Sequence, residues 1–324
     1  MFRKVAAIFA PLVRPLCRRK AGATSLTRCL HQTGAMAKQL QARRLDGIDK
    51  NPWVELTKLA SDYGTVNLGQ GFPDFAPPDF AVEAFQRALS EDYMLNQYTK
   101  AFVSPPALAA LCTQARRTLT GHIWSSVSQT SLPGMWHRTL TIGSAGKTFS
   151  ATGWKVGWVL GPEHLVKHLH TVHQNSVYHC ATQAQAAVAL SLEREQQHFG
   201  QPSSYFVQLP EATQHKRDHM IRSLQSVGMR PIIPQGSYFL IADISDFKSK
   251  MPNLPGATDE AYDSRFVKWM CRNKGLAAIP VSIFYSGPHQ KLFDHYVRFC
   301  FIKDEATLQA MDEKLQKWKA ELTP

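Results

Sequence analysis

Residues 144–158 have the sequence SAGKTFSATGWKVGW, in which Lys147 and Lys155 stand eight residues apart among glycines and hydroxyl side chains. The preceding residues 139–142 (TLTI) predict a strand, and residues 158–160 (WVL) predict a second strand that a Gly-Pro pair ends. Lys147 therefore lies on a loop after a strand, where small residues allow a ligand to come close.

The two lysines make this loop a candidate for covalent chemistry on an anionic ligand. Each cation lowers the pKa of the other, and both attract an anion. A neutral lysine amine attacks aldehydes and forms Schiff bases, and a hydroxyl such as that of Ser144 binds phosphate alongside a lysine. Pyridoxal phosphate (PLP) combines an aldehyde with a phosphate and suits both functions. The spacing of these residues by itself favours the plainer alternative of a solvated lysine on a Gly/Ser loop.

The loop resembles the lysine signature of the fold-type I, class I and II PLP-dependent aminotransferases. There, Ser-x-x-Lys precedes a second basic residue by eight positions. The resemblance covers residues 38–102 and 131–322, and within the family it points to the kynurenine aminotransferase branch, which includes glutamine transaminase K and cysteine-conjugate β-lyase. The motifs that carry it are RRLDG (43–47), NLGQGFPDF (67–75), NQYT (96–99) and the run from Leu132 to Trp158.

The resemblance implies a role for each matching residue. Lys147 is the catalytic lysine that binds PLP as a Schiff base, with Lys155 and Ser144 on the cofactor phosphate. Arg298 clamps the substrate α-carboxylate, because its planar fork meets a carboxylate through two hydrogen bonds. The other implied substrate-binding residues, some reaching across a dimer interface, are Gly71, Trp53, Tyr98, Tyr178 and His179. Tyr178 stands where the family often has Phe. The alternatives are a structural ion pair for Arg298 and core packing for Trp53 and Tyr98.

The implied reaction moves an amino group from kynurenine, or from an aromatic or glutamine-like amino acid, to a 2-oxo acid. β-Elimination from cysteine S-conjugates is a second implied activity. The implied partners are small amino acids and 2-oxo acids, and the family is homodimeric.

The expected fold is α/β, with two domains after a leader. Residues 36–199 are expected to form an N-terminal arm and an incomplete large domain with a mostly parallel sheet, and residues 200–324 a small α+β domain. The strands predicted in the small domain are 230–233, 237–244, 275–281 and 296–302. The predicted helices are a first one starting at 51–53, then 81–89, 163–173, 181–198, 204–226, 260–273 and 305–320.

Residues 103–130 depart from the family pattern and are expected to form an irregular junction. In the family a long segment here supplies most of the parallel sheet, a helix start under the phosphate, and an Asp on the pyridinium nitrogen. Residues 103–130 contain no Asp, Glu, Asn or Tyr, and a single glycine, Gly121. Because an acid holds the proton that makes the PLP ring an electron sink, the alternative function is a catalytically impaired variant that binds PLP weakly.

The formal charge of +12 belongs to the N-terminus. Ten Lys or Arg precede the first acidic residue, Asp46, which leaves 27 of the 37 basic residues against 25 acidic ones. This distribution argues against a nucleic-acid or membrane-surface partner, and no apolar run is long enough to span a membrane. The acid-free residues 1–35 predict a mitochondrial transit peptide, whereas a start at Met36 would give a cytoplasmic form. A secretory signal is disfavoured because Pro11 and Arg14 interrupt the apolar run.

The six cysteines are scattered rather than paired at metal-ligand spacing. We therefore expect no metal site. Those beyond the leader lie in apolar surroundings and are expected to be reduced core residues of an intracellular protein.

Overall fold

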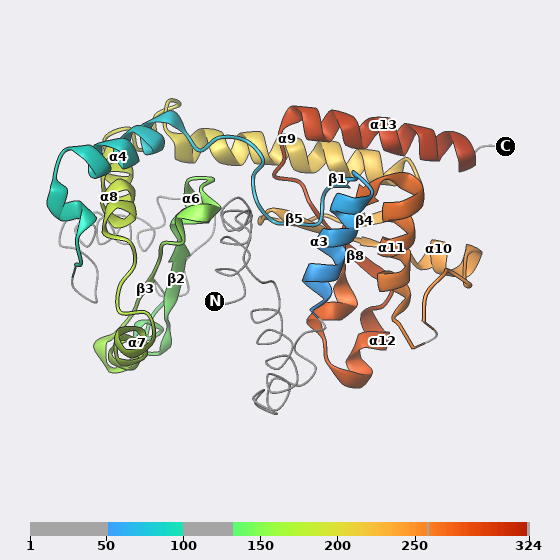
Figure 1. Cartoon of the computed structure of the whole chain (residues 1–324), viewed down its shortest axis with the longest axis horizontal. Coiled ribbons are helices and arrows are strands. Elements are labelled where there is room, and N and C mark those ends of the chain that lie inside the picture. The colour runs from blue at the N-terminus through green and yellow to red at the C-terminus, as the bar shows by residue number, and fades with distance from the viewer. Residues whose placement is uncertain (1–50, 100–131, 258, 323–324) are drawn as a thin grey trace, which may run out of the picture. The chain divides into compact units, whose positions relative to one another are not determined.

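The computed structural model describes residues 51–99, 132–257 and 259–322 (Figure 1). The leader, the motif at 43–47 and the junction 103–130 lie outside the described residues. Contacts group Glu55–Pro324 into one unit, and of the other unit, Met1–Val54, only residues 51–54 are described. The chain begins its described part with α3 (Pro52–Asp62), as the Asn-Pro-Trp start predicts.

Four antiparallel strands in the order β4-β5-β8-β7 form the sheet of the C-terminal part. Their bounds are Arg230–Ile232, Phe239–Asp243, Tyr296–Cys300 and Ile279–Pro280. Side chains alternate between the two faces. Leu240, Ala242 and Val297 are fully buried, whereas Phe239 and Arg298 lie half-buried on the opposite face. That second face is where the candidate site lies.

Three helices supply the core of this part: α9 (Tyr205–Gln225), α11 (Tyr262–Lys274) and α13 (Glu305–Leu322). They bury large apolar side chains against the sheet, among them Met220, Leu224, Phe266, Met311 and Trp318. At about 25 cal/mol per Å² of apolar area removed from water, such side chains dominate the stability of the part. Ser204 caps α9 by accepting a hydrogen bond from the Phe206 amide at 3.2 Å.

Asp263 is a fully buried carboxylate at the start of α11. It accepts hydrogen bonds from the Ser282 amide and hydroxyl, both at 2.7 Å, and from the Ser264 amide at 2.8 Å. These bonds tie α11 to the short 3-10 helix η6 (Val281–Phe284). Burial raises the pKa of Asp263 to about 6, and the hydrogen bonds from Ser282 and Ser264 oppose that rise.

Asp263 predicts a specific pH dependence of stability. Between about pH 4 and 6 the folded chain keeps the Asp263 proton and the unfolded chain releases it, so the carboxyl's contribution to stability falls as pH rises through this window. We expect the unfolding free energy of Asp263→Asn, minus that of the wild type, to rise by about 3 kcal/mol from pH 4 to pH 7. Urea unfolding at each pH measures this difference, and a flat difference would contradict the prediction.

The lysine-bearing part is built from a two-stranded antiparallel ladder. β2 (Thr141–Ser144) pairs with β3 (Gly157–Leu160). The strand predicted at 139–142 was placed two residues early, because Thr139 closes the 3-10 helix η4 (Trp136–Arg138), with its hydroxyl on the Met135 carbonyl at 2.7 Å. β1 (Val66–Asn67) pairs in parallel with β6 (Leu276–Ala277). Each of these two ladders has only two strands, which agrees with an incomplete α/β domain.

Helices α4 (Asp79–Ser90) and α8 (Thr182–Gln197) pack against each other (Figure 1). They enclose a small core of Ala81, Phe149, Val188 and Leu192. The remaining described elements are η2 (Tyr93–Asn96), α6 (Ala145–Thr148), η5 (Thr152–Trp154), α7 (Glu163–Ser176), α10 (Ser245–Lys250), η7 (Gly287–His289) and α12 (Gln290–Phe293).

Three of the six cysteines lie among the described residues. Cys271 and Cys300 are buried, Cys180 is half-buried, and all three are free thiols; Cys17, Cys29 and Cys112 lie outside the described residues. In the part of the chain that the structure describes, no cluster of His, Cys, Asp and Glu could hold a metal ion. No helix there is long and apolar enough to cross a membrane.

Candidate active site

Lys147 lies in α6, the single helical turn that follows β2. The turn is fixed to the end of the ladder by the Ala145 amide, which donates to the Val156 carbonyl at 2.9 Å. Gly146 is required because a Cβ there would lie 2.8 Å from the Thr152 Cα. Ser144 occupies the N-cap position of α6, is exposed, and makes no capping hydrogen bond. Its hydroxyl therefore stands beside Lys147 without a capping role.

Two long-range hydrogen bonds hold Lys147. Its Nζ donates to the Gly71 carbonyl at 2.5 Å, and its own carbonyl accepts from the Tyr238 hydroxyl at 2.5 Å. The amine also lies 5.7 Å from the centroid of the Tyr238 ring. Burial raises the pKa of Tyr238 to about 12, so its hydroxyl remains a donor at physiological pH.

The pKa of the Lys147 amine is lowered. Burial is the main cause, the Cys300 sulfur opposes it, and the cations of Arg298 and Lys155 lower the pKa further. A lowered pKa leaves more of the amine neutral, which is the form that attacks an aldehyde.

Lys155 joins η5 to β3 in the left-handed backbone conformation, with φ 57° and ψ 34°. Ser150, on the same loop, also has a positive φ of 53°. Non-glycine residues rarely adopt this conformation, and the surrounding fold has to enforce it. The enforced turn keeps the exposed Lys155 cation close enough to Lys147 to lower its pKa.

Arg298 projects from β8, where it is paired with Ile241 on one side and Ile279 on the other. Its Nη2 donates to the Gly69 carbonyl at 3.2 Å. The guanidinium carbon lies 4.1 Å from the Phe239 ring centroid and 5.1 Å from that of Phe284. Burial lowers the pKa of Arg298, although an arginine stays charged at physiological pH.

The loop 67–75 brings Lys147 and Arg298 to the same backbone. Asn67 Oδ1 accepts from the Gly69 and Gln70 amides, both at 3.1 Å, which bends the loop just after β1. Further along, Asp74 accepts from the Asp304 amide at 2.6 Å and the Thr307 hydroxyl at 2.8 Å. The loop is thus anchored at both ends, with the carbonyls of residues 69 and 71 facing Arg298 and Lys147.

The predicted aromatic residues form a second group. The Tyr98 ring lies 6.1 Å from Tyr178 and 5.4 Å from His179, both edge to face. Tyr98 is 83% exposed and Tyr178 is 50% exposed. Trp53 lies in the first turn of α3, where its amide donates to the Asn51 side chain. The substrate-binding roles of these four residues stay predictions.

The sequence motifs did not predict three residues around the site: Tyr238, Phe239 and Phe284. The strand register could have revealed Phe239. Arg298 is directly opposite Ile241, and Phe239 lies two residues before Ile241 on the same face, at the diagonal distance that long side chains can bridge. Phe284, on a 3-10 helix, had no periodic signal.

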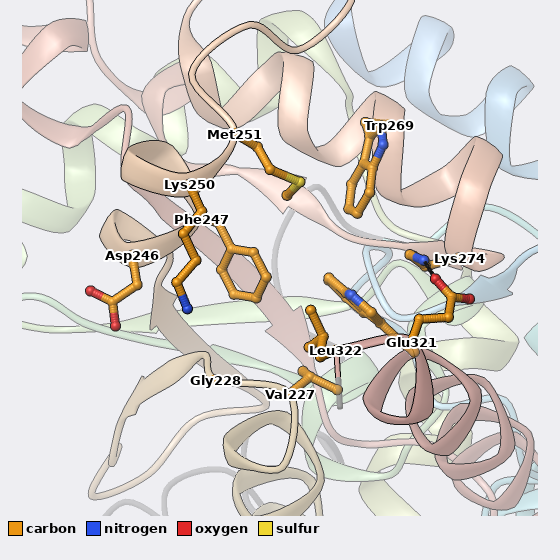
Figure 2. A pocket seen from close by; sticks show the side chains of 11 residues that line it. Val227, Gly228, Asp246, Phe247, Lys250, Met251, Trp269, Lys274, Glu321 and Leu322 are labelled. Carbon is orange, nitrogen blue, oxygen red and sulfur yellow. Dashed lines mark hydrogen bonds and ion pairs between the residues drawn. The ribbon is translucent and has the colours of Figure 1, made fainter. Parts of the chain in front are cut away.

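A cavity of about 500 Å³ lies elsewhere, between α10, α11 and the end of α13 (Figure 2). Phe247, Trp269 and Trp318 form its apolar wall, and the Lys274–Glu321 ion pair lies at its edge. None of the predicted site residues lines it. This cavity is therefore distinct from the candidate active site.

Solved structures identify the class of fold. Bna3p from Saccharomyces cerevisiae superposes with a TM-score of 0.75 at 19% identity, over 87% of this chain and 99% of its own. N-Succinyldiaminopimelate aminotransferase from Mycobacterium tuberculosis gives 0.72 at 21% identity, over 86% and 100%. The fold is that of the fold-type I PLP-dependent transferases, and the expected fold class is confirmed.

Sequence comparison identifies the family. The family model of aminotransferase class I and II matches residues 121–315. Kynurenine–oxoglutarate transaminase 1 from Homo sapiens is 52% identical, covering 89% of this chain and all of that protein, and kynurenine–oxoglutarate transaminase 3 from Mus musculus is 33% identical, covering 86% and 90%. The chain belongs to the class I and II aminotransferases, as its lysine motif predicted, and is a PLP-dependent transaminase by family.

The same alignment shows how much shorter this chain is. It spans 422 positions, while 89% of 324 residues is about 288, so about 134 positions have no residue from this chain. This difference agrees with the prediction of an incomplete large domain.

Proposed function

We propose that this chain is a PLP-dependent aminotransferase that moves an amino group from kynurenine, or from another aromatic or glutamine-like amino acid, to a 2-oxo acid. One observation carries the proposal. Lys147 and Arg298, which are 151 residues apart in sequence, donate hydrogen bonds to the carbonyls of Gly71 and Gly69, respectively. A nucleophilic amine and a carboxylate-binding arginine are thereby held on one short loop. The names of the relatives support the choice of kynurenine as donor.

The described residues fit two ends of PLP. The Lys147 amine, with its lowered pKa, suits the aldehyde, and the cation of Lys155 with the exposed hydroxyl of Ser144 suits the phosphate. When bound, the cofactor supplies an electron sink for the substrate α-carbon. Residues 103–130 contain no Asp or Glu that could partner the ring nitrogen.

The protein residues bind and orient the substrate and move its proton. Arg298 receives the α-carboxylate in the plane of its guanidinium, which fixes the α-carbon relative to the loop 67–75. The neutral Nζ of Lys147 takes up the α-proton as a general base, because its pKa is closer to the working pH than that of an ordinary lysine. Gly71 supplies the backbone carbonyl that holds this amine.

Arg298→Gln tests the proposal. Because the glutamine cannot offer a charged bidentate clamp, we expect kcat/KM for kynurenine with a 2-oxo acid to fall by about 10²-fold or more. Kynurenamine, which lacks the α-carboxylate, should bind equally well to both proteins. Arg230→Gln is the matched control, since Arg230 is an exposed arginine paired with Asp243 and Asp246. Equal losses for kynurenine and kynurenamine binding would overturn the role of Arg298.

A second candidate function is a catalytically impaired variant of such an enzyme, with part of the PLP site missing. The alignment favours it, because about 134 positions of the human relative have no counterpart among these 324 residues. The junction 103–130, which has no Asp or Glu, cannot supply the missing acid. A comparison of turnover with the human relative separates the two candidates.

Four finer features belong to the same proposal. We infer β-elimination from cysteine S-conjugates at the same lysine. We also infer a homodimer, for which the exposed rings of Tyr98 and Tyr178, with the half-buried His179 beside them, provide an aromatic surface. Translation from Met1 sends the chain to the mitochondrial matrix, and translation from Met36 leaves it in the cytoplasm. Residues 36–199 and 200–324 form the large and small domains.

A further inference from the structure

We propose that Phe239 and Phe284 are positioning residues that hold the Arg298 guanidinium between their rings and thereby set the affinity of the site for a carboxylate. The inference rests on the proposed function, in which Arg298 binds the substrate α-carboxylate. It names two residues outside the lysine motif that decide how well the substrate is held.

The guanidinium lies over both rings. Its central carbon is 4.1 Å from the Phe239 centroid and 5.1 Å from the Phe284 centroid, inside the range of cation–π contacts. One nitrogen, Nη2, donates to the Gly69 carbonyl at 3.2 Å. Aromatic contacts act on the faces of the cation and hydrogen bonds act at its edge, so the two kinds of contact do not compete.

Phe239 is fixed by the sheet and by the loop. It pairs with Cys300 in the β5–β8 ladder, on the same face as Arg298. A Cβ added to Gly71 would lie 2.2 Å from the Phe239 ring, so the ring packs directly against the loop backbone. The Gly71 carbonyl on that loop accepts the hydrogen bond from Lys147. Phe239 therefore contacts both the arginine and the segment that holds the lysine.

Phe284 is fixed through the buried carboxylate of Asp263. The 3-10 helix η6 ends at Phe284, and its second residue, Ser282, donates from both amide and hydroxyl to Asp263 at 2.7 Å. Asp263 and Ser282 are almost completely buried. The ring of Phe284 is thus carried by a short element that is anchored two residues away, rather than by a free loop.

The physical effect is a restriction of the arginine side chain. An arginine side chain loses much of its rotamer freedom when it is ordered. Rings that order it before the substrate arrives remove part of that cost from binding. Loss of one ring should therefore weaken carboxylate binding by about tenfold, while a neutral ligand of the same shape is little affected.

The test compares 3-phenylpropionate with its neutral isostere 3-phenylpropionamide on the full chain in excess PLP. Calorimetric titration of the wild type, Phe239→Leu and Phe284→Leu gives the ratio of the two affinities. We expect the preference for the carboxylate over the amide to fall about tenfold in each leucine variant. Phe239→Tyr should retain the wild-type preference, because tyrosine keeps an aromatic ring at this position. Phe293→Leu is the matched control: Phe293 stacks on Tyr285 with centroids 3.9 Å apart and is half-buried like Phe239.

A second measurement detects the contact without a ligand. In protein with isotope-labelled arginine, the Arg298 side-chain NMR signals, assigned through Arg298→Lys, should shift when either ring is removed and stay in place in Phe293→Leu. An unchanged carboxylate preference in both leucine variants, with Arg298→Lys losing it, would overturn the inference and leave the proposed function intact. If Arg298→Lys itself keeps the preference, the proposed role of Arg298 fails instead. Equal weakening of both ligands would show a merely structural role for the rings and would also overturn the inference.

Discussion

Lys147→Ala is expected to abolish covalent attachment of PLP to this chain. The amine of Lys147 has a lowered pKa because it is partly buried and lies near the cations of Arg298 and Lys155. A neutral amine is the form that reacts with an aldehyde, so Lys147 should outcompete the other exposed lysines of the chain. After borohydride reduction and proteolysis, mass spectrometry should find the cofactor on the peptide that contains residue 147 in the wild type. In the variant the cofactor should be absent from every peptide.

Two other lysine variants separate the reactive amine from its surroundings. Lys167→Ala removes an exposed lysine of α7 and should leave labelling unchanged. Lys155→Ala should keep the attachment site at residue 147 but require more PLP, because one cation near the phosphate is lost. Labelling of Lys155 or Lys167 in preference to Lys147 would contradict the assignment of the nucleophile.

The local part of this site could be predicted from sequence because its residues are contiguous. Ser144, Lys147 and Lys155 lie within twelve residues, and the strands that flank them have clear patterns. The hydrogen bond from Lys147 to Gly71 links residues that are 76 positions apart, and the one from Arg298 to Gly69 links residues that are 229 positions apart. No local pattern contains such a contact; only the family resemblance suggested that these residues work together.

The fold prediction likewise succeeded where the pattern is local and failed where distant segments pair. The long helices α8, α9, α11 and α13 were predicted to within about two residues, because each has several turns of apolar periodicity. The six-residue helix α10 was missed, since it is too short to show a period. The β4-β5-β8-β7 order could not be read from the chain, because the pairing of β5 with β8 joins distant segments. Phe239 became visible as a neighbour of Arg298 only once this register was known, and Phe284, which lies on η6 outside the sheet, only from the structure itself.

The turnover of this chain should be much lower than that of a complete relative. We expect kcat/KM of this chain for kynurenine and a 2-oxo acid to be at least about 10³-fold below that of the 52% identical human transaminase measured side by side. Removing a single electrostatic partner of a reacting group costs about 10²- to 10³-fold. Here, residues 103–130, where the family resemblance places the acid for the ring nitrogen, contain no Asp or Glu. The loss of a helix N-terminus under the phosphate would add weaker cofactor binding.

A chimera tests whether the missing segment causes this low turnover. Replacing residues 103–130 with the corresponding, longer segment of the human relative should restore PLP affinity and turnover to near that enzyme's level, because Lys147, Lys155 and Arg298 are already in place. Lys147→Ala in the chimera should remove the gain. If the unmodified chain binds PLP tightly and turns over within about tenfold of the relative, the impaired variant is rejected, since the effect of a lost electrostatic partner would be missing. If the chimera alone is active, the lysine loop and the arginine strand are competent parts of a site whose other side lies in the absent segment.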